Sequence, residues 1–83
     1  MFQVKYLRTF CSKIILMIKF AERLKELRNE KNLSRTDLAN LLQVNPRTIS
    51  YWELSQRECN LEQLCKIAQI FKVSTDYILG LED

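Results

Sequence analysis

The stretch RTDLANLLQVNPRTISYWE, residues 35–53, decides the fold of this chain. Apolar side chains at helical spacing stand on both sides of a short interruption, which predicts helices over residues 35–42 and 46–53. Asn45 followed by Pro46 marks the start of the second helix, because Asn caps helices and Pro prefers the first helical position. The stretch therefore predicts two short helices joined by a tight turn.

The two predicted helices have apolar inner faces that can pack on each other. Ser34 and Asp37 have the spacing of a capping box at the start of the first helix. Ala39 is small enough to let the two helix axes approach closely. The other apolar residues of this seam are Leu38, Leu42, Val44, Ile49 and Trp52. The second helix is thereby held by one side and presents its other side to solvent.

The outer face of the second helix is polar without being a ladder of charges. It carries Pro46, Arg47, Ser50 and Tyr51. A helix with such a face fits the major groove of DNA, which is about 12 Å wide, and can present donors to base edges. Two short helices joined by a turn of about four residues are typical of the helix-turn-helix motif. We therefore expect double-stranded DNA as the partner.

The sequence outside this motif predicts three more helices and no strand, so the expected fold class is all-α with five helices. One helix covers residues 20–31. Another follows its cap, Asn60, and a last short one covers residues 74–79 between the cap Ser74 and Gly80. The apolar stripe predicted for the helix after Asn60 is Leu61, Leu64, Cys65, Ala68 and Phe71. A chain of 83 residues with one Gly and one Pro suits one small helical domain.

Residues 1–19 are expected to form an N-terminal extension, and residues 20–83 the domain. The extension has four basic residues and no acidic one, whereas the rest of the chain has nine basic and ten acidic residues. The basic residues of the extension are Lys5, Arg8, Lys13 and Lys19. DNA binding therefore cannot be argued from the net charge of +3, and depends on where individual arginines lie.

Two interpretations of the extension stay open. Its apolar residues at intervals of three and four could line an extra helix that packs on the domain or on a second subunit. These residues are Leu7, Phe10, Cys11, Ile14 and Ile18. Alternatively, residues 1–16 reflect an upstream choice of start codon, because Met17 directly precedes the domain. A secretory signal or membrane span is rejected, because the apolar run is short and Lys19 interrupts it. We expect a cytoplasmic protein.

The cysteines and the absence of histidine argue against a metal, a cofactor and catalysis. Cys11, Cys59 and Cys65 lie far apart in the sequence, and no His completes a zinc site. An odd cysteine count suits a reducing cytosol, with Cys65 in the core and Cys59 in a loop. An enzyme would lack a base or nucleophile, and would need a ligand pocket for which we expect so small a core to have no room.

Three segments carry a resemblance to a known family: FAERLKELRNEKNLS (20–34), residues 35–53 quoted above, and LEQLCKIAQIFKVSTDYILGLED (61–83). With them, residues 20–83 resemble the Xre/Cro family of small repressors, whose lambda repressor-like domain has five helices. The resemblance implies base contacts by Pro46, Arg47, Ser50 and Tyr51. It implies phosphate contacts by Ser34, Arg35, Asn45, Thr48, Ser55, Gln56 and Arg57. It also implies a structural, largely buried ion pair between Arg28 and Glu53.

The chain departs from the family pattern at two positions of the motif. Gln43 stands where the turn usually has Gly, because the backbone there is left-handed, and a residue with a side chain costs about 1 kcal/mol in that conformation. Pro46 stands where relatives often have a hydrogen-bonding side chain. Its apolar edge can only meet a thymine methyl group, so sequence readout is expected to depend on Arg47 and Tyr51.

The function expected from this resemblance is a sequence-specific transcriptional repressor that binds a palindromic operator as a homodimer. The expected dimer surface comprises Tyr77, Ile78, Leu79 and Leu81, extended by residues 7–18. A controller of a restriction system, which can also activate, is a variant of this hypothesis. The alternative is an antitoxin-type protein-interaction module that uses the same fold to mask a toxin, with residues 1–19 as its docking element.

Overall fold

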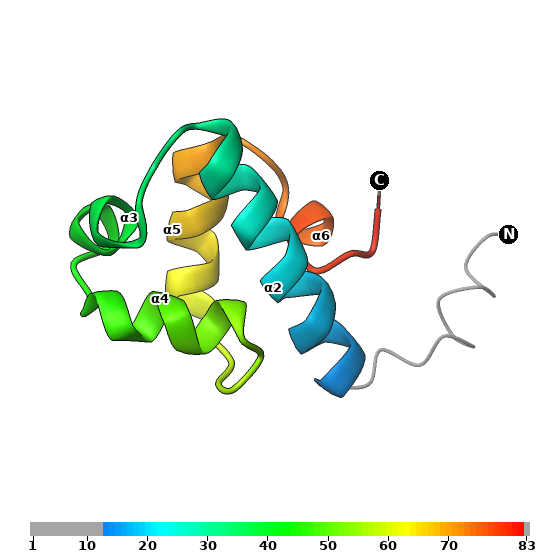
Figure 1. Cartoon of the computed structure of the whole chain (residues 1–83). Helices are drawn as coiled ribbons and strands as arrows, with labels where there is room; N and C mark the ends of the chain where they lie inside the picture. The colour runs from blue at the N-terminus through cyan, green and yellow to red at the C-terminus, as the bar shows by residue number, and fades with distance from the viewer. Residues whose placement is uncertain (1–12, 83) are drawn as a thin grey trace, which may run out of the picture.

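The described part of the chain is entirely helical (Figure 1). The computed structural model describes residues 13–82, which contain five helices and no strand. The helices are α2 (Lys13–Glu30), α3 (Arg35–Leu42), α4 (Pro46–Glu53), α5 (Leu61–Phe71) and α6 (Thr75–Ile78). The predicted all-α fold is confirmed. The bounds of α3 and α4 are those predicted from the sequence.

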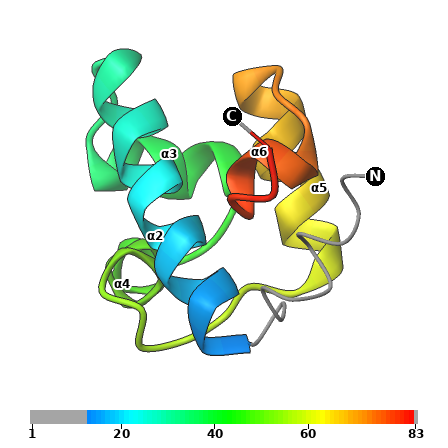
Figure 2. The same cartoon turned by 90° about the vertical axis from the view of Figure 1, so that its right-hand side faces the viewer.

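The helices surround one core to which each contributes a fully buried aliphatic residue. In Figure 1, α5 runs through the middle of the view, with α3 and α4 on one side and α2 and α6 on the other. Turned by 90°, the same arrangement shows α6 lying between α2 and α5 (Figure 2), and α6 contacts both helices. The largest fully buried side chains are those of Leu24, Leu38, Ile49, Ile67 and Ile78. This shared core fixes α3 and α4 relative to the rest of the domain.

Side-chain caps begin α3 and α4 where the sequence predicts them. The Ser34 hydroxyl accepts a hydrogen bond from the Asp37 amide at 3.0 Å, and the Asp37 carboxylate accepts one from the Ser34 amide at 3.0 Å. The hydrogen bond that the carboxylate accepts from the Ser34 amide is the largest cause that lowers the pKa of Asp37. Asn45 accepts from the Arg47 amide at 2.8 Å and precedes Pro46 at the first helical position. Gln43 has φ of 60°, the left-handed conformation expected at the turn.

The first helix starts earlier than predicted. α2 begins at Lys13, not at residue 20, so it runs without a break across the predicted boundary between extension and domain. Residues 13–19 contain no Gly or Pro and consist of residues that a helix tolerates well. Ile14 and Ile18 are exposed on α2. Leu7, Phe10 and Cys11, the other members of the predicted apolar face, lie outside the described residues.

The buried face of α5 is rotated from the predicted stripe. Leu61 is 80% exposed and Cys65 is also exposed, whereas Ile67, which was not predicted in the stripe, is buried. The face that packs on the core is Leu64, Ile67, Ala68 and Phe71. Cys65 was predicted in the core and is exposed, whereas Cys59 lies in the loop between α4 and α5, as predicted. Cys59 packs against the core, and burial raises the pKa of its thiol to about 11.

One residue of the predicted dimer surface faces inward. Ile78 is fully buried in the core of its own chain. Tyr77, Leu79 and Leu81 are partly exposed. The Tyr77 ring is covered on one face by the guanidinium of Arg23, whose carbon lies 4.2 Å from the ring centroid. Ile78 is therefore unavailable to a second copy of the chain.

Candidate DNA-binding surface

α4 has one buried face and one face open to solvent. Ile49 and Trp52 are buried, and the Trp52 ring meets the Phe20 ring of α2 edge-on, with centroids 6.1 Å apart. Pro46 and Arg47 are exposed on the other side of α4. Thr48, Ser50 and Tyr51 are partly exposed. The packing of Trp52 against α2 therefore fixes which side of α4 points outward.

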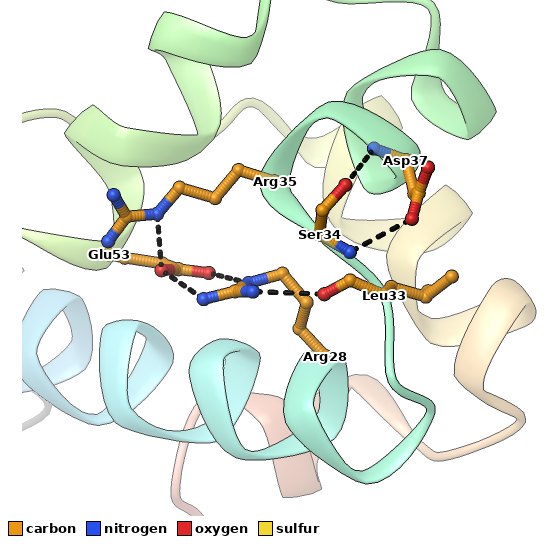
Figure 3. A network of polar contacts seen from close by, with 6 residues as sticks. All are labelled: Arg28, Leu33, Ser34, Arg35, Asp37 and Glu53. Carbon is orange, nitrogen blue, oxygen red and sulfur yellow. Dashed lines mark hydrogen bonds and ion pairs between the residues drawn. The ribbon is translucent and has the colours of Figure 1, made fainter.

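A buried carboxylate ties the end of α4 to α2 and to the start of α3 (Figure 3). Glu53, whose side chain is 1% exposed, accepts from Arg28 through Nε at 2.6 Å and through Nη2 at 3.1 Å. The ion pair implied by the resemblance is thus present. The Nε atom of Arg35 also donates to Glu53, at 3.1 Å. This second arginine on Glu53 is a tertiary contact that the sequence analysis missed.

The candidate phosphate-binding residues include the caps of α3 and α4 and the loop that follows α4. Ser34 and Asn45 are exposed caps, and each already uses a side-chain oxygen to accept from a helix amide. The Ser55 hydroxyl donates to the Met17 carbonyl of α2 at 3.5 Å, so it is turned toward α2. Gln56 and Arg57 are exposed in the loop that follows α4.

Tyr51 and Arg57 form a stacked pair at the end of α4. The guanidinium carbon of Arg57 lies 4.5 Å from the centroid of the Tyr51 ring. One face of this ring is therefore occupied by a cation of the same chain. The contact depends on the loop conformation, in which the Gln56 amide donates to the Tyr51 carbonyl at 2.8 Å and Ser55 has φ of 58°. No local sequence signal predicts that conformation.

Arg47 differs from the other arginines of this surface. Among residues 13–82, its side chain forms no ion pair and no hydrogen bond, whereas Arg35 and Arg57 both contact another side chain. It stands at the second position of α4, beside Pro46. Its guanidinium is therefore the polar group of α4 that is most available to an external ligand.

A cavity lies between the N-terminal part of α2 and the start of α5. It has a volume of about 310 Å³ and a mainly apolar lining that includes Leu16, Met17 and Leu61. The expectation that so small a core leaves no room for a pocket is therefore wrong. Residues 13–82 contain no group of three side chains that could hold a metal ion. Within that same range, no helix combines the length and apolar character needed to cross a bilayer.

The fold and the exposed polar face of α4 define a helix-turn-helix domain. A family model described as helix-turn-helix matches residues 24–78, and the chain belongs to this family. The resemblance to the Xre/Cro type of lambda repressor-like domain is confirmed.

Similar proteins include regulators of known structure. The HTH-type transcriptional activator BcrR of Enterococcus faecalis is 38% identical over 66 residues, which cover 80% of this chain and 32% of BcrR. A transcriptional regulator from Listeria innocua is 33% identical, with a TM-score of 0.72 over 77% of this chain and 60% of that one. The restriction-modification controller protein C.AhdI from Aeromonas hydrophila is 31% identical, with a TM-score of 0.68 over 75% and 94%.

The similarity to most of these relatives is confined to one domain and does not extend over their whole length. This chain spans 32% to 57% of the length of the curated relatives it matches. Hydroxypropylphosphonic acid epoxidase from S. wedmorenis is 34% identical, with a TM-score of 0.68, but the match covers 32% of that enzyme. A match to about a third of the enzyme shows a shared helical domain and no shared reaction.

Proposed function

We propose that this chain is a sequence-specific transcriptional regulator that reads double-stranded DNA with α4 in the major groove. The observation that carries the proposal is the division of α4 into two faces. Ile49 and Trp52 anchor it in the core, while Pro46 and Arg47 project to solvent. A helix held in this way can enter the groove as a rigid probe without exposing apolar core.

The base contacts are assigned to the outer face of α4. Among residues 13–82 the Arg47 guanidinium has no ion-pair or hydrogen-bond partner, and an arginine fork matches the two acceptors of guanine in the major groove. Ser50 and Tyr51 offer hydroxyl groups one turn further along, and Pro46 offers an apolar edge for a thymine methyl group. Arg47 is expected to contribute most, because it combines exposure with freedom from intramolecular partners.

The backbone contacts are assigned to the starts of α3 and α4, to Thr48 within α4 and to the loop that follows α4. They are Ser34, Arg35, Asn45, Thr48, Ser55, Gln56 and Arg57. The two arginines supply charge, and the others supply neutral donors that fix the register of the domain on the duplex. Ser55 is the weakest member, because its hydroxyl already donates to Met17.

A homodimer on a near-palindromic operator completes the proposal. One domain of this size buries little surface on DNA, so tight specific binding calls for a second copy and a second half-site. The proposed regulator represses transcription when it occupies a promoter, as the family resemblance implies. Related proteins include other kinds of regulator: BcrR is a transcriptional activator, and C.AhdI is a restriction-modification controller protein.

Selection from a pool of random duplexes tests this function. Purified full chain is incubated with the pool at low salt, bound duplexes are amplified and sequenced, and the cycle is repeated. The expected result is an inverted repeat whose half-sites are centred about 10 base pairs, or a multiple of this, apart. Binding without any enriched sequence would contradict sequence-specific readout. Enrichment of a single half-site would contradict only the homodimer and would leave sequence-specific readout intact.

A further inference from the structure

Glu53 divides its hydrogen bonds unequally between two arginines. Arg28, whose side chain is 11% exposed, uses Nε and Nη2 on Glu53 and donates Nη1 to the Leu33 carbonyl at 2.9 Å. Arg35, whose side chain is 42% exposed, uses only Nε. Among the described residues its two terminal nitrogens form no hydrogen bond, and Figure 3 shows them on the side of the guanidinium away from Arg28.

The charge of this cluster is also unevenly placed. Two guanidinium groups share one carboxylate, so the cluster carries one excess positive charge. Arg28 already neutralises Glu53 inside the domain, and the excess therefore lies on Arg35, where solvent reaches it. A guanidinium can be held through Nε while its terminal nitrogens form a fork toward a phosphate, an arrangement that the ammonium of a lysine cannot copy.

The backbone beneath Arg35 is fixed as well. Ser34 and Asp37 form the reciprocal capping box described above, and Arg35 is the first residue of α3. A free arginine side chain has several rotatable bonds whose freedom is lost when it binds. A side chain that is already held at both its Cα and its Nε loses less conformational entropy when it binds.

We propose that Glu53 is a positioning residue for DNA binding, which holds the guanidinium of Arg35 with its terminal nitrogens directed at a backbone phosphate. The proposal rests on the function proposed above, in which Arg35 contacts a phosphate. It gives Glu53 a second role beside its ion pair with Arg28. The carboxylate thus assists the binding of an anion, although its own charge repels one.

A double-mutant cycle on Glu53 and Arg35 tests this role. Affinity for a selected duplex and its salt dependence are measured for the wild type, Arg35→Ala, Glu53→Gln and the double variant, with folding checked by circular dichroism. Arg35→Ala is expected to weaken binding about tenfold and to reduce the salt slope by about 0.9, the value for one phosphate. Glu53→Gln leaves the charge of Arg35 in place, so it is expected to weaken binding by a smaller factor, about two- to fivefold, and to keep most of the salt slope. The double variant is expected to lose no more than Arg35→Ala alone.

The sign of the Glu53→Gln effect separates positioning from simple electrostatics. Removal of a negative charge near the duplex should by itself tighten binding. A folded Glu53→Gln variant that binds as tightly as the wild type, or more tightly, would overturn the proposal. If the wild type binds no duplex the proposed function fails, whereas if only Arg35→Ala weakens binding the positioning role alone fails.

Arg35→Lys tests the positioning role of Glu53 if the Glu53→Gln variant does not fold. Its ammonium cannot bond to Glu53 and offer a fork to the phosphate at once, so its affinity is expected to lie between those of Arg35→Ala and the wild type. Wild-type affinity for Arg35→Lys would contradict the proposal. The salt dependence of Arg35→Lys serves as its internal control, because the lysine keeps the positive charge and should keep a salt slope close to that of the wild type.

Discussion

Arg57 lies over the ring of Tyr51, with its guanidinium carbon 4.5 Å from the ring centroid. The pair links the last turn of α4 to the loop that follows it. Tyr51 was assigned to base contacts and Arg57 to a phosphate from the sequence, and the structure adds a direct contact between them. We expect the aromatic ring to orient Arg57 toward the duplex backbone.

Two substitutions of Tyr51 distinguish the role of its ring in DNA binding from the role of its hydroxyl group. Tyr51→Leu removes the stack and is expected to weaken DNA binding by about 0.5–1 kcal/mol, the size of an exposed cation–π contact. Tyr51→Leu combined with Arg57→Ala should lose little more than Arg57→Ala alone. Fluorescence anisotropy with a labelled selected duplex measures these affinities.

Tyr51→Phe is the matched control, because it keeps the ring and removes only the hydroxyl. Wild-type affinity for Tyr51→Phe would assign the role of Tyr51 to the stack. A loss confined to the selected duplex would instead assign the hydroxyl to a base contact. Full additivity of the Tyr51→Leu and Arg57→Ala losses would contradict the orienting role of the ring.

Two leucines of α3 provide a matched test of the core. Leu38 is fully buried and Leu41 is 55% exposed, so the same change to alanine removes the same atoms from two different environments. Leu38→Ala is expected to lower the free energy of unfolding by about 2–5 kcal/mol, and Leu41→Ala by about 0.5 kcal/mol or less. Urea denaturation followed by Trp52 fluorescence measures both. Equal losses would contradict the described packing of α3.

Gly80 is required by its surroundings as well as by its backbone. Its φ is 79°, and a Cβ atom added there would lie 2.6 Å from Cβ of Lys19. Gly80→Ala is therefore expected to lower the free energy of unfolding by about 1–3 kcal/mol, through backbone strain and overpacking. Thermal denaturation followed by circular dichroism measures this loss, and an unchanged melting temperature would show that Lys19 does not lie against Gly80.

The two described cysteines should differ in reactivity. Cys65 is exposed, whereas Cys59 packs against the core and burial raises the pKa of its thiol to about 11. Because the thiolate is the reactive form, Cys59 is expected to react slowly with a disulfide reagent at pH 8 and faster as the pH approaches 11. Variants that retain only Cys59 or only Cys65 are compared by absorbance. Faster modification of Cys59 at pH 8 would contradict its burial.

Local signals in the sequence predicted the helix-turn-helix well. Ser34, Asn45 and Pro46 act on the backbone within their own turn, so the starts of α3 and α4 follow from neighbouring residues alone. Gln43 adopts its left-handed conformation although it is not Gly. The resemblance to a known family also supplied the Arg28–Glu53 ion pair, which no local rule would give.

Features that depend on tertiary packing were predicted less well. α5 could present either of two overlapping apolar stripes, and contact with the core selected Ile67 over Cys65. The helical conformation of residues 13–19 was not predicted, because a helix that simply continues has no start signal at residue 20. The contact of Arg35 with Glu53 joins residues 18 positions apart, and only the packed structure brings them together.

If the outer face of α4 reads bases, substitution of Arg47 should lower affinity for one sequence more than for another. The affinities of the wild type and Arg47→Ala are compared on a selected duplex and on a scrambled duplex at one salt concentration. The account predicts a loss of about 1–3 kcal/mol on the selected duplex and a much smaller loss on the scrambled one. Equal losses on both duplexes would show that Arg47 contacts only the backbone and would contradict the account.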